Sequence, residues 1–477
     1  MSLIYKKLGE IYTQYILIVV MSFIGISAAV YAAEPVQTLS LEEAVYLSQS
    51  NDPWLVSNQF QQDAIKSESI AAGTLPDPKI SVGLANLSIN TFDFGQEAMT
   101  QMKIGVTQMF PRGDSLSLRK QQLELMAEQY PFLRQDRRAK LSVTTAQIWF
   151  DVYKAQESIA LIERNRNLFE QLSDVVKAGY SSALVKSNQQ DIIRAQLEVT
   201  RLEDKLTVLA QQEDMFKQKL SEWVGKAFVD EYRIGHEQDY ELLFSTFTVP
   251  NILPQIKLTN PNLYFDEEKS QHYQQSLYEA FSVHPLISAL EQRIESSRKG
   301  VELKKQLYKP EWGVNAGYSY RGNDPMGNSR DDLLSIGVSF DLPIFTSSKQ
   351  DKQVQAAIYQ SESIKTEKWL LLRNMMASYG TAKAQLLKLE QRQTLYNDFL
   401  LPQMQDQADA SLTAYTNDKG DFAEVVRSLI AQLNTQLDAL AINVDLQKVK
   451  VQLNYFFTPK VGPVSISHKS YVDGEVK

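Results

Sequence analysis

The chain has no cysteine and only four histidines among its 477 residues. The lack of cysteine excludes disulfides, thiolate metal sites, cysteine nucleophiles and a lipid-anchored N-terminal cysteine. The histidines, His236, His272, His284 and His468, are scattered without metal-ligand spacing, and no phosphate loop or nucleophile motif appears. We therefore expect no enzyme activity, no catalytic residue, no metal site and no cofactor. For His284, which precedes a proline, we predict a helix-capping or surface role.

Basic residues are fewer than acidic residues, and long apolar runs are also scarce. The chain has 49 Lys and Arg residues against 57 Asp and Glu residues, a net charge of −8. Nucleic-acid binding demands clustered basic residues, so no nucleic acid is expected as a partner. The mean hydropathy of −0.29 excludes a bundle of membrane-spanning helices.

One apolar run, over 16–30, is typical of an export signal. Lys6 and Lys7 precede it, and it ends in small residues at Ala32 and Ala33. This pattern predicts a signal peptide over 1–32, cleaved after Ala32. The run has about 15 residues, fewer than the roughly 20 that cross a bilayer, which disfavours the alternative of an uncleaved anchor helix.

A motif and several prolines recur 232 positions along the chain, which indicates an internal repeat. The matches are Pro53 with Pro285, Pro78 with Pro310, Pro111 with Pro343, and Ile104-Gly105-Val106-Thr107 with Ile336-Gly337-Val338-Ser339. Each copy runs from a helical stretch through two alternating strands to a very long helical stretch. We divide the chain into a signal peptide (1–32), a first repeat (33–225), a linker or equatorial belt (226–275), a second repeat (276–457) and a C-terminal tail (458–477).

Four short segments alternate between apolar and small or polar residues, as strands with two different faces do. They are expected at about 78–90, 101–111, 311–321 and 333–343. Each has about ten residues, the length of a tilted transmembrane strand. The residues expected to face the membrane are Trp312, Val314, Tyr318, Tyr320, Ile336, Val338 and Phe340. The alternative is a pair of half-buried hairpins in a soluble domain, although no further strands are present to pack against them.

Four strands cannot seal themselves in lipid. Every backbone polar group there must be paired, so a membrane sheet has to close, and the smallest single-chain barrels have eight strands. The chain therefore needs copies of itself. Three copies would supply twelve strands, enough to leave an opening inside.

The helical stretches are too long for an ordinary globular domain. Residues from about 115 to 178 contain no glycine and one proline, Pro131, and would reach roughly 95 Å as a helix. A second stretch, about 348–414, is interrupted only by Gly380 and Pro402, and both prolines are expected to kink their helices. Shorter return helices are expected at about 187–224 and 422–456. Their apolar stripes predict packing against neighbouring helices.

With these features the chain resembles the TolC-type outer-membrane factor family over about residues 38–457. The supporting segments are Leu39-Ser40-Leu41-Glu42-Glu43-Ala44, Leu75-Pro76-Asp77-Pro78 and Tyr415-Thr416-Asn417-Asp418-Lys419-Gly420-Asp421-Phe422. The resemblance implies a mainly α fold with a small membrane β part, built from the duplicated hairpin-plus-long-helix unit. It implies a homotrimer whose 12-stranded β-barrel is continued by a 12-helix periplasmic α-barrel.

The resemblance also implies a function and partners. The protein would be the channel-tunnel of a tripartite efflux system in the outer membrane of a Gram-negative bacterium. It would passively conduct substrate from an inner-membrane pump and a periplasmic adaptor, with outer-membrane lipid around its strands. Segments 97–100 and 108–111 are similar to the heavy-metal or cation efflux branch. Drug or solute efflux and type I protein secretion are the alternative cargoes, and an envelope coiled-coil scaffold is the alternative class.

The family places its closed periplasmic entrance at the tip turns, here 179–188 and 415–421. The gate or pore-constriction residues that this implies are Asp191, Arg194, Asp418, Asp421, Glu424 and Arg427. A threefold axis would turn one carboxylate into a ring that attracts cations. Arg427 stands where the family often has a second acid. The alternative is an ordinary solvated helix start in which Asp421 is only a cap.

Overall fold

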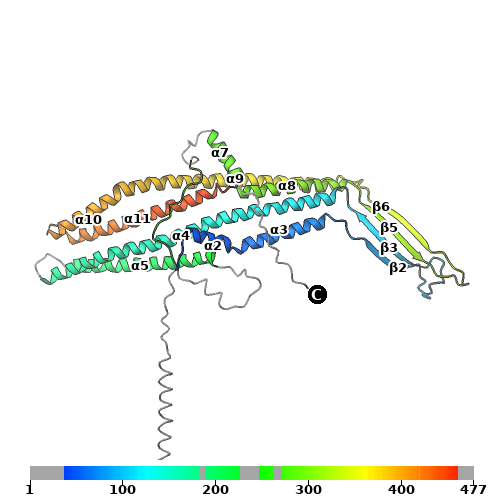
Figure 1. Ribbon diagram of the computed structural model, residues 1–477, viewed down its shortest axis with the longest axis horizontal. Coiled ribbons are helices and arrows are strands. Elements are labelled where there is room, and N and C mark those ends of the chain that lie inside the picture. Colours follow the sequence, from blue (N-terminus) through cyan, green and yellow to red (C-terminus); the bar gives the residue numbers. More distant parts are fainter. Residues whose placement is uncertain (1–36, 183–188, 226–246, 262–270, 418, 460–477) are drawn as a thin grey trace, which may run out of the picture.

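The computed structural model describes residues 37–182, 189–225, 247–261, 271–417 and 419–459. The signal peptide expected at 1–32 lies outside these residues, as does most of the expected tail. The molecule is elongated, with long helices running side by side and a small sheet continuing from one end (Figure 1). Within the described residues, none of the helices combines the length and apolar character needed to cross a membrane.

The first repeat contains two short helices, two strands and a long helical hairpin. Helices α2 (Leu41–Ser50) and α3 (Pro53–Ala72) lead to strands β2 (Lys79–Ala85) and β3 (Gln101–Phe110). Helix α4 (Ser115–Ser182) follows, with 68 residues, and continues through Pro131 without interruption. At 1.5 Å per residue it is about 100 Å long. Helix α5 (Gln189–Val224) returns along it.

The second repeat has the same order. Helices α7 (Gln271–Ser282) and α8 (Pro285–Lys305), with a short 3₁₀ turn η2 (Gln306–Tyr308), precede strands β5 (Trp312–Tyr320) and β6 (Leu333–Phe340). The long helix is divided into α9 (Gln350–Leu395), a π-helical turn η3 (Tyr396–Leu400) and α10 (Leu401–Thr416). Helix α11 (Phe422–Tyr455) returns along it. The division falls at Pro402, which lies in the first turn of α10, where a missing N–H costs least.

The four long strands form one antiparallel sheet in the order β2-β3-β5-β6. Its register places apolar residues opposite one another across all four strands, as in the row Val82, Ile104, Tyr318 and Leu334. Because alternate residues face opposite ways, the sheet has one largely apolar face, which Gln108 of β3 interrupts opposite Val314. Strands β2 and β6 are its two edges.

Strand β2 is shorter than the sequence predicts. The expected strand at 78–90 is wrong beyond Ala85, because Asn86 takes a left-handed backbone conformation with φ of 57°. Its side-chain amide donates to the Met99 carbonyl at 3.0 Å, and its carbonyl accepts from the Thr100 hydroxyl at 2.7 Å. The local hydrogen bonds of Asn86 thus replace strand pairing, which explains why the apolar alternation slips at this point.

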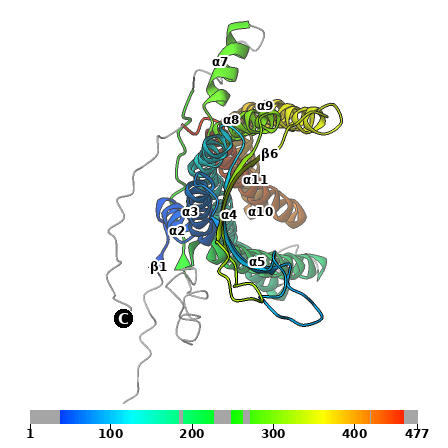
Figure 2. The ribbon, with the colours of Figure 1, turned by 90° about the vertical axis from the view of Figure 1, so that its right-hand side faces the viewer.

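The helices lie side by side in two overlapping groups (Figures 1 and 2). Nearer the sheet the order of contact is α3, α4, α8 and α9, and nearer the far tip it is α5, α4, α11 and α10. Each helix of a group is therefore buried along narrow stripes against its neighbours. Within the described residues, α3 packs mainly against α4, whereas α9 contacts α8 near the sheet and α11 farther along its length.

Residues 247–261 lie across the middle of this helical layer. Strands β1 (Gln37–Thr38) and β4 (Phe247–Thr248) pair in parallel there. Side-chain amides hold the following segment: Gln447 accepts from the Ile256 N–H at 2.8 Å, and Asn454 accepts from the Thr259 N–H at 2.9 Å. The linker expected at 226–275 overlaps α7, which begins at Gln271 and runs past the expected boundary.

Candidate functional site

The two hairpin tips lie together at the end of the molecule opposite the sheet (Figure 1). One tip joins α4 to α5 and the other joins α10 to α11. Residues 183–188 of the first turn are outside the described residues, and so is Asp418 of the second. The remaining expected gate residues, Asp191, Arg194, Asp421, Glu424 and Arg427, lie at the starts of the two return helices.

At the start of α11 the charged side chains have local roles. Asp421 is the N-cap residue, and its carboxylate accepts a hydrogen bond from the Ala423 N–H at 3.2 Å. Glu424 lies in the first turn, where its charge interacts favourably with the helix dipole. Its carboxylate also pairs with the Arg427 guanidinium one turn further on. Asp421 and Arg427 are exposed and Glu424 is half-buried, so a single copy presents them to solvent.

At the start of α5, Asp191 lies in the first turn and is half-buried, while Arg194 is exposed one turn later. Ala195, next to Arg194, is buried in a cluster that joins both hairpins. That cluster is apolar and comes from α4, α5, α10 and α11: Ile162, Phe169, Leu172, Ala195, Leu202, Ala408, Phe422, Val425, Val426, Leu429 and Leu433. The structure thus brings the two helix starts to one shared core.

The second tip turn depends on close backbone approach. The Lys419 N–H donates to the Ala414 carbonyl at 2.9 Å, which closes the end of α10. A Cβ added at Gly420 would lie 2.7 Å from the Tyr415 backbone nitrogen. The Tyr415 ring packs on that of Phe422 with centroids 5.7 Å apart. A larger residue at position 420 would require the backbone of this compact turn to shift.

At the opposite end, the sheet presents the residues expected to face a membrane. All seven are exposed in a single copy: Trp312, Val314, Tyr318, Tyr320, Ile336, Val338 and Phe340. Trp312 lies opposite Phe340, with ring centroids 4.9 Å apart, at the end of the sheet that adjoins the helices. Tyr318 and Tyr320 lie towards the other end. The aromatic residues therefore mark two levels, as interfacial belts do.

The structure contains a buried polar network at the middle of the helical layer that the sequence did not predict. His284, fully buried, begins α8 and accepts the Leu286 N–H on Nδ1 at 3.2 Å. Its Nε2 is 3.2 Å from the Tyr455 carbonyl. Because Nδ1 accepts, Nε2 carries the proton and donates. The expected capping role of His284 is confirmed, while the alternative of a surface position is wrong.

The same network continues to α4. The Tyr455 hydroxyl donates to Asp136 at 2.8 Å, and the Lys140 ammonium lies 2.7 Å from the same carboxylate. Burial lowers the pKa of His284 below its usual range, although the Asp136 charge opposes that effect. Burial also raises the pKa of Tyr455, with a further contribution from Asp136, so the phenol stays protonated.

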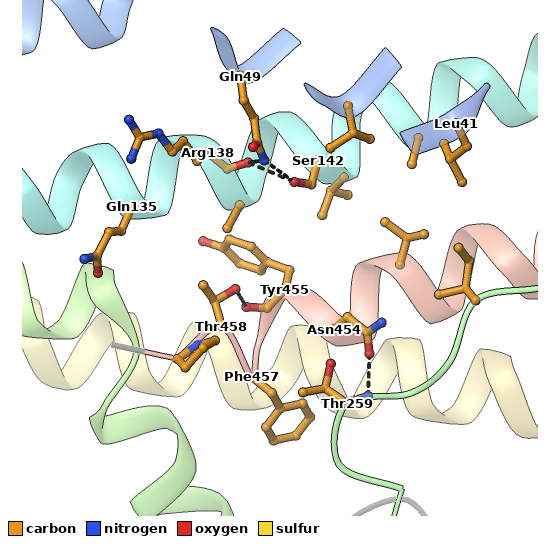
Figure 3. A pocket seen from close by; sticks show the side chains of 17 residues that line it. Leu41, Gln49, Gln135, Arg138, Ser142, Thr259, Asn454, Tyr455, Phe457 and Thr458 are labelled. Atoms are coloured by element: carbon orange, nitrogen blue, oxygen red, sulfur yellow. Dashed lines mark hydrogen bonds between the residues drawn. The ribbon is translucent and has the colours of Figure 1, made fainter. Parts of the chain in front are cut away.

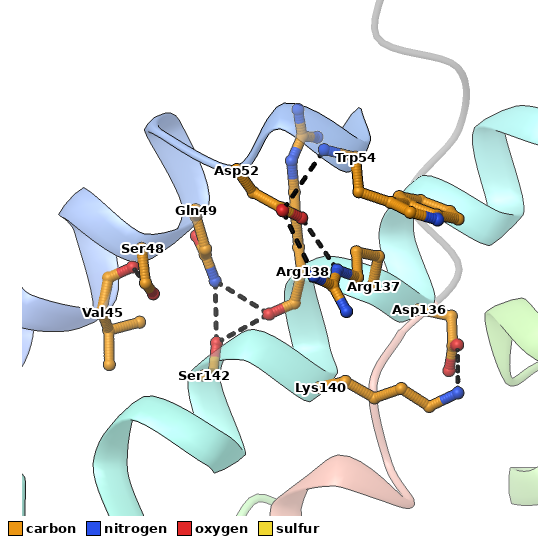
Figure 4. A network of polar contacts seen from close by, with 10 residues as sticks. All are labelled: Val45, Ser48, Gln49, Asp52, Trp54, Asp136, Arg137, Arg138, Lys140 and Ser142. Atoms are coloured by element: carbon orange, nitrogen blue, oxygen red, sulfur yellow. Dashed lines mark hydrogen bonds and ion pairs between the residues drawn. The ribbon is translucent and has the colours of Figure 1, made fainter. Parts of the chain in front are cut away.

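A matching arrangement holds the first repeat, 232 positions earlier. Asp52 begins α3, accepts the Trp54 N–H at 3.3 Å, and pairs with the Arg137 guanidinium at 2.8 Å (Figure 4). That guanidinium also lies over the rings of Trp54 and Trp223, at 5.7 and 5.6 Å. The sequence feature that could have indicated this pair of helix caps is the equivalent position of Asp52 and His284, each directly before a repeated proline.

Beside the network lies a largely apolar cavity of about 530 Å³ between α2, α4 and the end of α11 (Figure 3). Its polar edge includes Gln49, whose amide donates to the Arg138 carbonyl at 3.1 Å and the Ser142 hydroxyl at 2.7 Å. Among the described residues, no group of three or more His, Asp or Glu side chains could hold a metal ion.

No protein-family model and no curated protein sequence matches the chain. Solved structures do match its fold. The outer-membrane channel OprN gives a TM-score of 0.69 at 13% identity, over 88% of this chain and 90% of that one. The Campylobacter jejuni CmeC outer-membrane channel gives 0.69 at 11% identity, over 88% and 87%. The Vibrio cholerae outer-membrane protein VceC gives 0.68 at 11% identity, over 88% and 96%. The chain is thus mainly helical with a small sheet, and it shares the fold of these outer-membrane proteins.

Proposed function

We propose that the protein is the outer-membrane exit duct of a tripartite efflux system. The observation that carries this proposal is the joining of two features in one chain. A sheet with one largely apolar face and two open edges leads directly into helical hairpins about 100 Å long. An apolar sheet face suits lipid, and hairpins of that length suit a conduit through the periplasm. The fold shared with outer-membrane channels supports the same reading.

The duct would be a homotrimer. Three four-stranded sheets would complete a 12-stranded barrel, and three sets of hairpins would complete a 12-helix cylinder below it. Unpaired strand edges are costly in lipid, so closure would supply the missing hydrogen bonds. The protein would provide no energy of its own. An inner-membrane pump would supply substrate, and a periplasmic adaptor would hold the pump to the duct.

The hairpin tips would form the periplasmic gate. Asp421 and Glu424, repeated around a threefold axis, would surround the pore with carboxylates, and such rings attract cations. The compact turn at Gly420 and the apolar cluster shared by both tips would hold the closed state. Opening would require the tip hairpins to move apart around that cluster.

For the cargo we propose metal cations, supported by the similarity of segments 97–100 and 108–111 to the cation branch. Drug or solute efflux and protein secretion are the competing cargoes. Deletion of the coding sequence, followed by growth on graded metal salts and on a drug panel, separates them. Increased sensitivity to metals alone supports the proposal, and sensitivity to drugs alone contradicts it.

The duct itself is tested by membrane fractionation and conductance. The protein should fractionate with the outer membrane, require detergent for extraction, run as a trimer and give discrete channels in planar bilayers. A coiled-coil scaffold would be released in buffer without detergent and would give no channels. That result would overturn the proposal.

A further inference from the structure

We infer that the strand section of the proposed duct carries fixed positive charge on its inner face and favours anions over cations. The inference rests on the proposed function, because it assigns the face of the sheet opposite the apolar one to a water-filled pore. Strands of a membrane barrel alternate between side chains that face lipid and side chains that face the lumen. Charge in the second set therefore acts directly on the solutes that pass.

The charge on the four long strands comes from two lysines. Strands β2, β3, β5 and β6 contain Lys79 and Lys103 and no other Lys, Arg, Asp or Glu. Both lie on the face opposite the apolar one, which we call the inner face. Lys79 on β2 is opposite Thr107. Lys103 on β3 is opposite Gly83 on one side and Ser319 on the other. Three copies would place six ammonium groups, two from each, around one opening.

The other side chains at the middle of the inner face are small and lie close to the sheet. The Ser81 hydroxyl oxygen is 2.8 Å from the point where a Cβ on Gly105 would be. The Asn315 amide oxygen is 2.8 Å from the same point on Gly337. These polar side chains thus lie across the glycines of neighbouring strands. A long lysine side chain extends beyond such a wall.

Lys103 is the main source of positive potential on this face. Both lysines are exposed, and neither forms an ion pair with a described residue. A Cβ added at Gly83, directly opposite Lys103, would meet nothing within 4 Å, so the Lys103 side chain does not lie across β2. Edge strands often carry lysine to prevent further pairing, but Lys103 lies on the inner strand β3. The exposed carboxylate of Asp77, two positions before Lys79, offsets part of the Lys79 charge.

Two acidic residues that flank the sheet are held by other groups. At the helical end, Asp341 pairs with the Arg112 guanidinium. At the far end, Asp332 accepts from the Arg321 N–H at 3.0 Å and from the hydroxyl of Tyr318, which belongs to the apolar face. These two carboxylates therefore do not neutralise the lysines of the inner face. The remaining acidic residues at the far end lie in the loops beyond the strands: Asp93, Glu97, Asp324 and Asp331.

The two ends of the duct would then carry opposite charge. The hairpin tips are proposed to present carboxylates, which attract cations, while the strand section presents ammonium groups, which attract anions. An anionic solute would cross the strand section more readily than a free metal cation. A metal cargo would pass it most readily when bound to anionic ligands.

The absence of cysteine allows the potential to be measured at one reporter thiol on the inner face. The reporter is Ser81→Cys, because Ser81 is exposed, follows Lys79 by two positions and is a diagonal neighbour of Lys103, at about 7–8 Å. The full-length protein in lipid vesicles is treated on both sides with an anionic or a cationic methanethiosulfonate that cannot cross lipid. The ratio of the two modification rates cancels the reactivity of the thiol itself and reports the local potential.

The ratio of the anionic to the cationic rate should fall several-fold when Lys103→Gln is added to the reporter. It should stay near its starting value with Lys103→Arg, which keeps the charge. Lys79→Gln should have a smaller effect. The effect of Lys103 should grow when salt is lowered from about 0.15 M to about 0.01 M, since the Debye length rises from about 8 Å to about 30 Å. Equal ratios in the glutamine and arginine variants would overturn the inference.

A second reporter separates failure of this inference from failure of the proposed duct. Val82→Cys, the next position on β2, lies on the apolar face, where lipid should protect it from both charged reagents. A reactive Ser81→Cys whose rate ratio does not depend on Lys103 would keep the duct and contradict the positive potential. Equal reactivity of the two reporters, or no reaction at either, would contradict the barrel in lipid and the inference with it.

Discussion

At the scale of single residues, the two repeats cap the start of an equivalent helix with different side chains. Both α3 and α8 begin at a residue that accepts the N–H two positions later, before a proline that needs no partner. In the first repeat this residue is Asp52, whose charge is balanced by Arg137. In the second it is His284, which is fully buried. Its neutral side chain carries no negative charge and therefore needs no cationic partner. A neutral imidazole provides both an acceptor and a donor there.

The first prediction concerns His284 and pH. Since burial lowers its pKa, the folded state favours the neutral ring, and the unfolded state binds a proton more readily. The stability that this provides is fully present above the unfolded pKa of about 6.5 and is lost as pH falls towards the lowered value. The groups facing the ring are Asp136, Lys140 and Tyr455.

The test compares His284→Ala with His284→Asn in thermal unfolding followed by helical circular dichroism. Alanine removes the cap and leaves a cavity, which should cost about 2–4 kcal/mol. Asparagine can still cap the helix, so it should cost less. Both should flatten the decline in stability of the wild type between about pH 7 and 5. An undiminished decline in His284→Asn would show that another group is responsible.

A second prediction concerns the carboxylates at the start of α11. Replacing Asp421 by Asn and Glu424 by Gln removes both charges, and the new asparagine would still be able to cap the helix. If these groups line the pore, cation selectivity and block by trivalent cations in planar bilayers should weaken several-fold. The control is Glu362→Gln on α9, which also breaks an i,i+3 pair, with Lys365. Unchanged selectivity in the double variant would assign Asp421 and Glu424 to the helix start alone.

At the scale of elements, the sequence predicts those features that depend on local pattern. Strand alternation, the absence of glycine in α4 up to the tip and the common 232-residue offset all gave correct element types. The early end of β2 was missed, because it depends on the left-handed conformation of Asn86 and its bonds to Met99 and Thr100. The contact of His284 with Tyr455 joins residues 171 positions apart. No pattern in the neighbouring sequence predicts a contact between residues so far apart.

The third prediction concerns the turn between α10 and α11. In Gly420→Ala the new methyl group would meet the Tyr415 backbone nitrogen, so the turn must shift, at a cost of about 1–3 kcal/mol. The tip should open more often, and trypsin should cleave after Lys419 faster than in the wild type. The control is Gly380→Ala in the middle of α9, where the methyl group meets nothing within 4 Å. Helix propensity predicts a neutral or slightly stabilising effect there.

At the scale of the whole molecule, a single copy leaves apolar side chains of both edge strands exposed. Ile80 on one edge strand is 72% exposed and Val338 on the other is 61% exposed. Among the described residues, the edge helix α3 packs mainly against α4, whereas the inner helix α4 packs against α3, α5, α8 and α11. Contiguous exposed apolar surface of this kind marks contact with protein or lipid. Lipid suits the face of the sheet, while the helical edges continue into the part that we assign to the periplasm, where only another protein surface can cover them.

The last prediction follows from that distinction. Phe60→Glu places a charge on the exposed apolar face of α3, where Val56, Phe60 and Ala64 line a shallow cavity, and where the proposed trimer would place the next copy. Tyr46→Glu is the matched control, because Tyr46 is an aromatic residue of almost equal exposure, 68% against 69%, on α2, outside the cavity that Phe60 lines. Burying an unpaired carboxylate in the contact is strongly unfavourable. Native mass spectrometry in detergent should therefore show mostly monomer for Phe60→Glu and trimer for Tyr46→Glu, with equal helix content in both. If Phe60→Glu assembles as well as the control, the face of α3 does not hold the copies together, and the strand edges alone must do so.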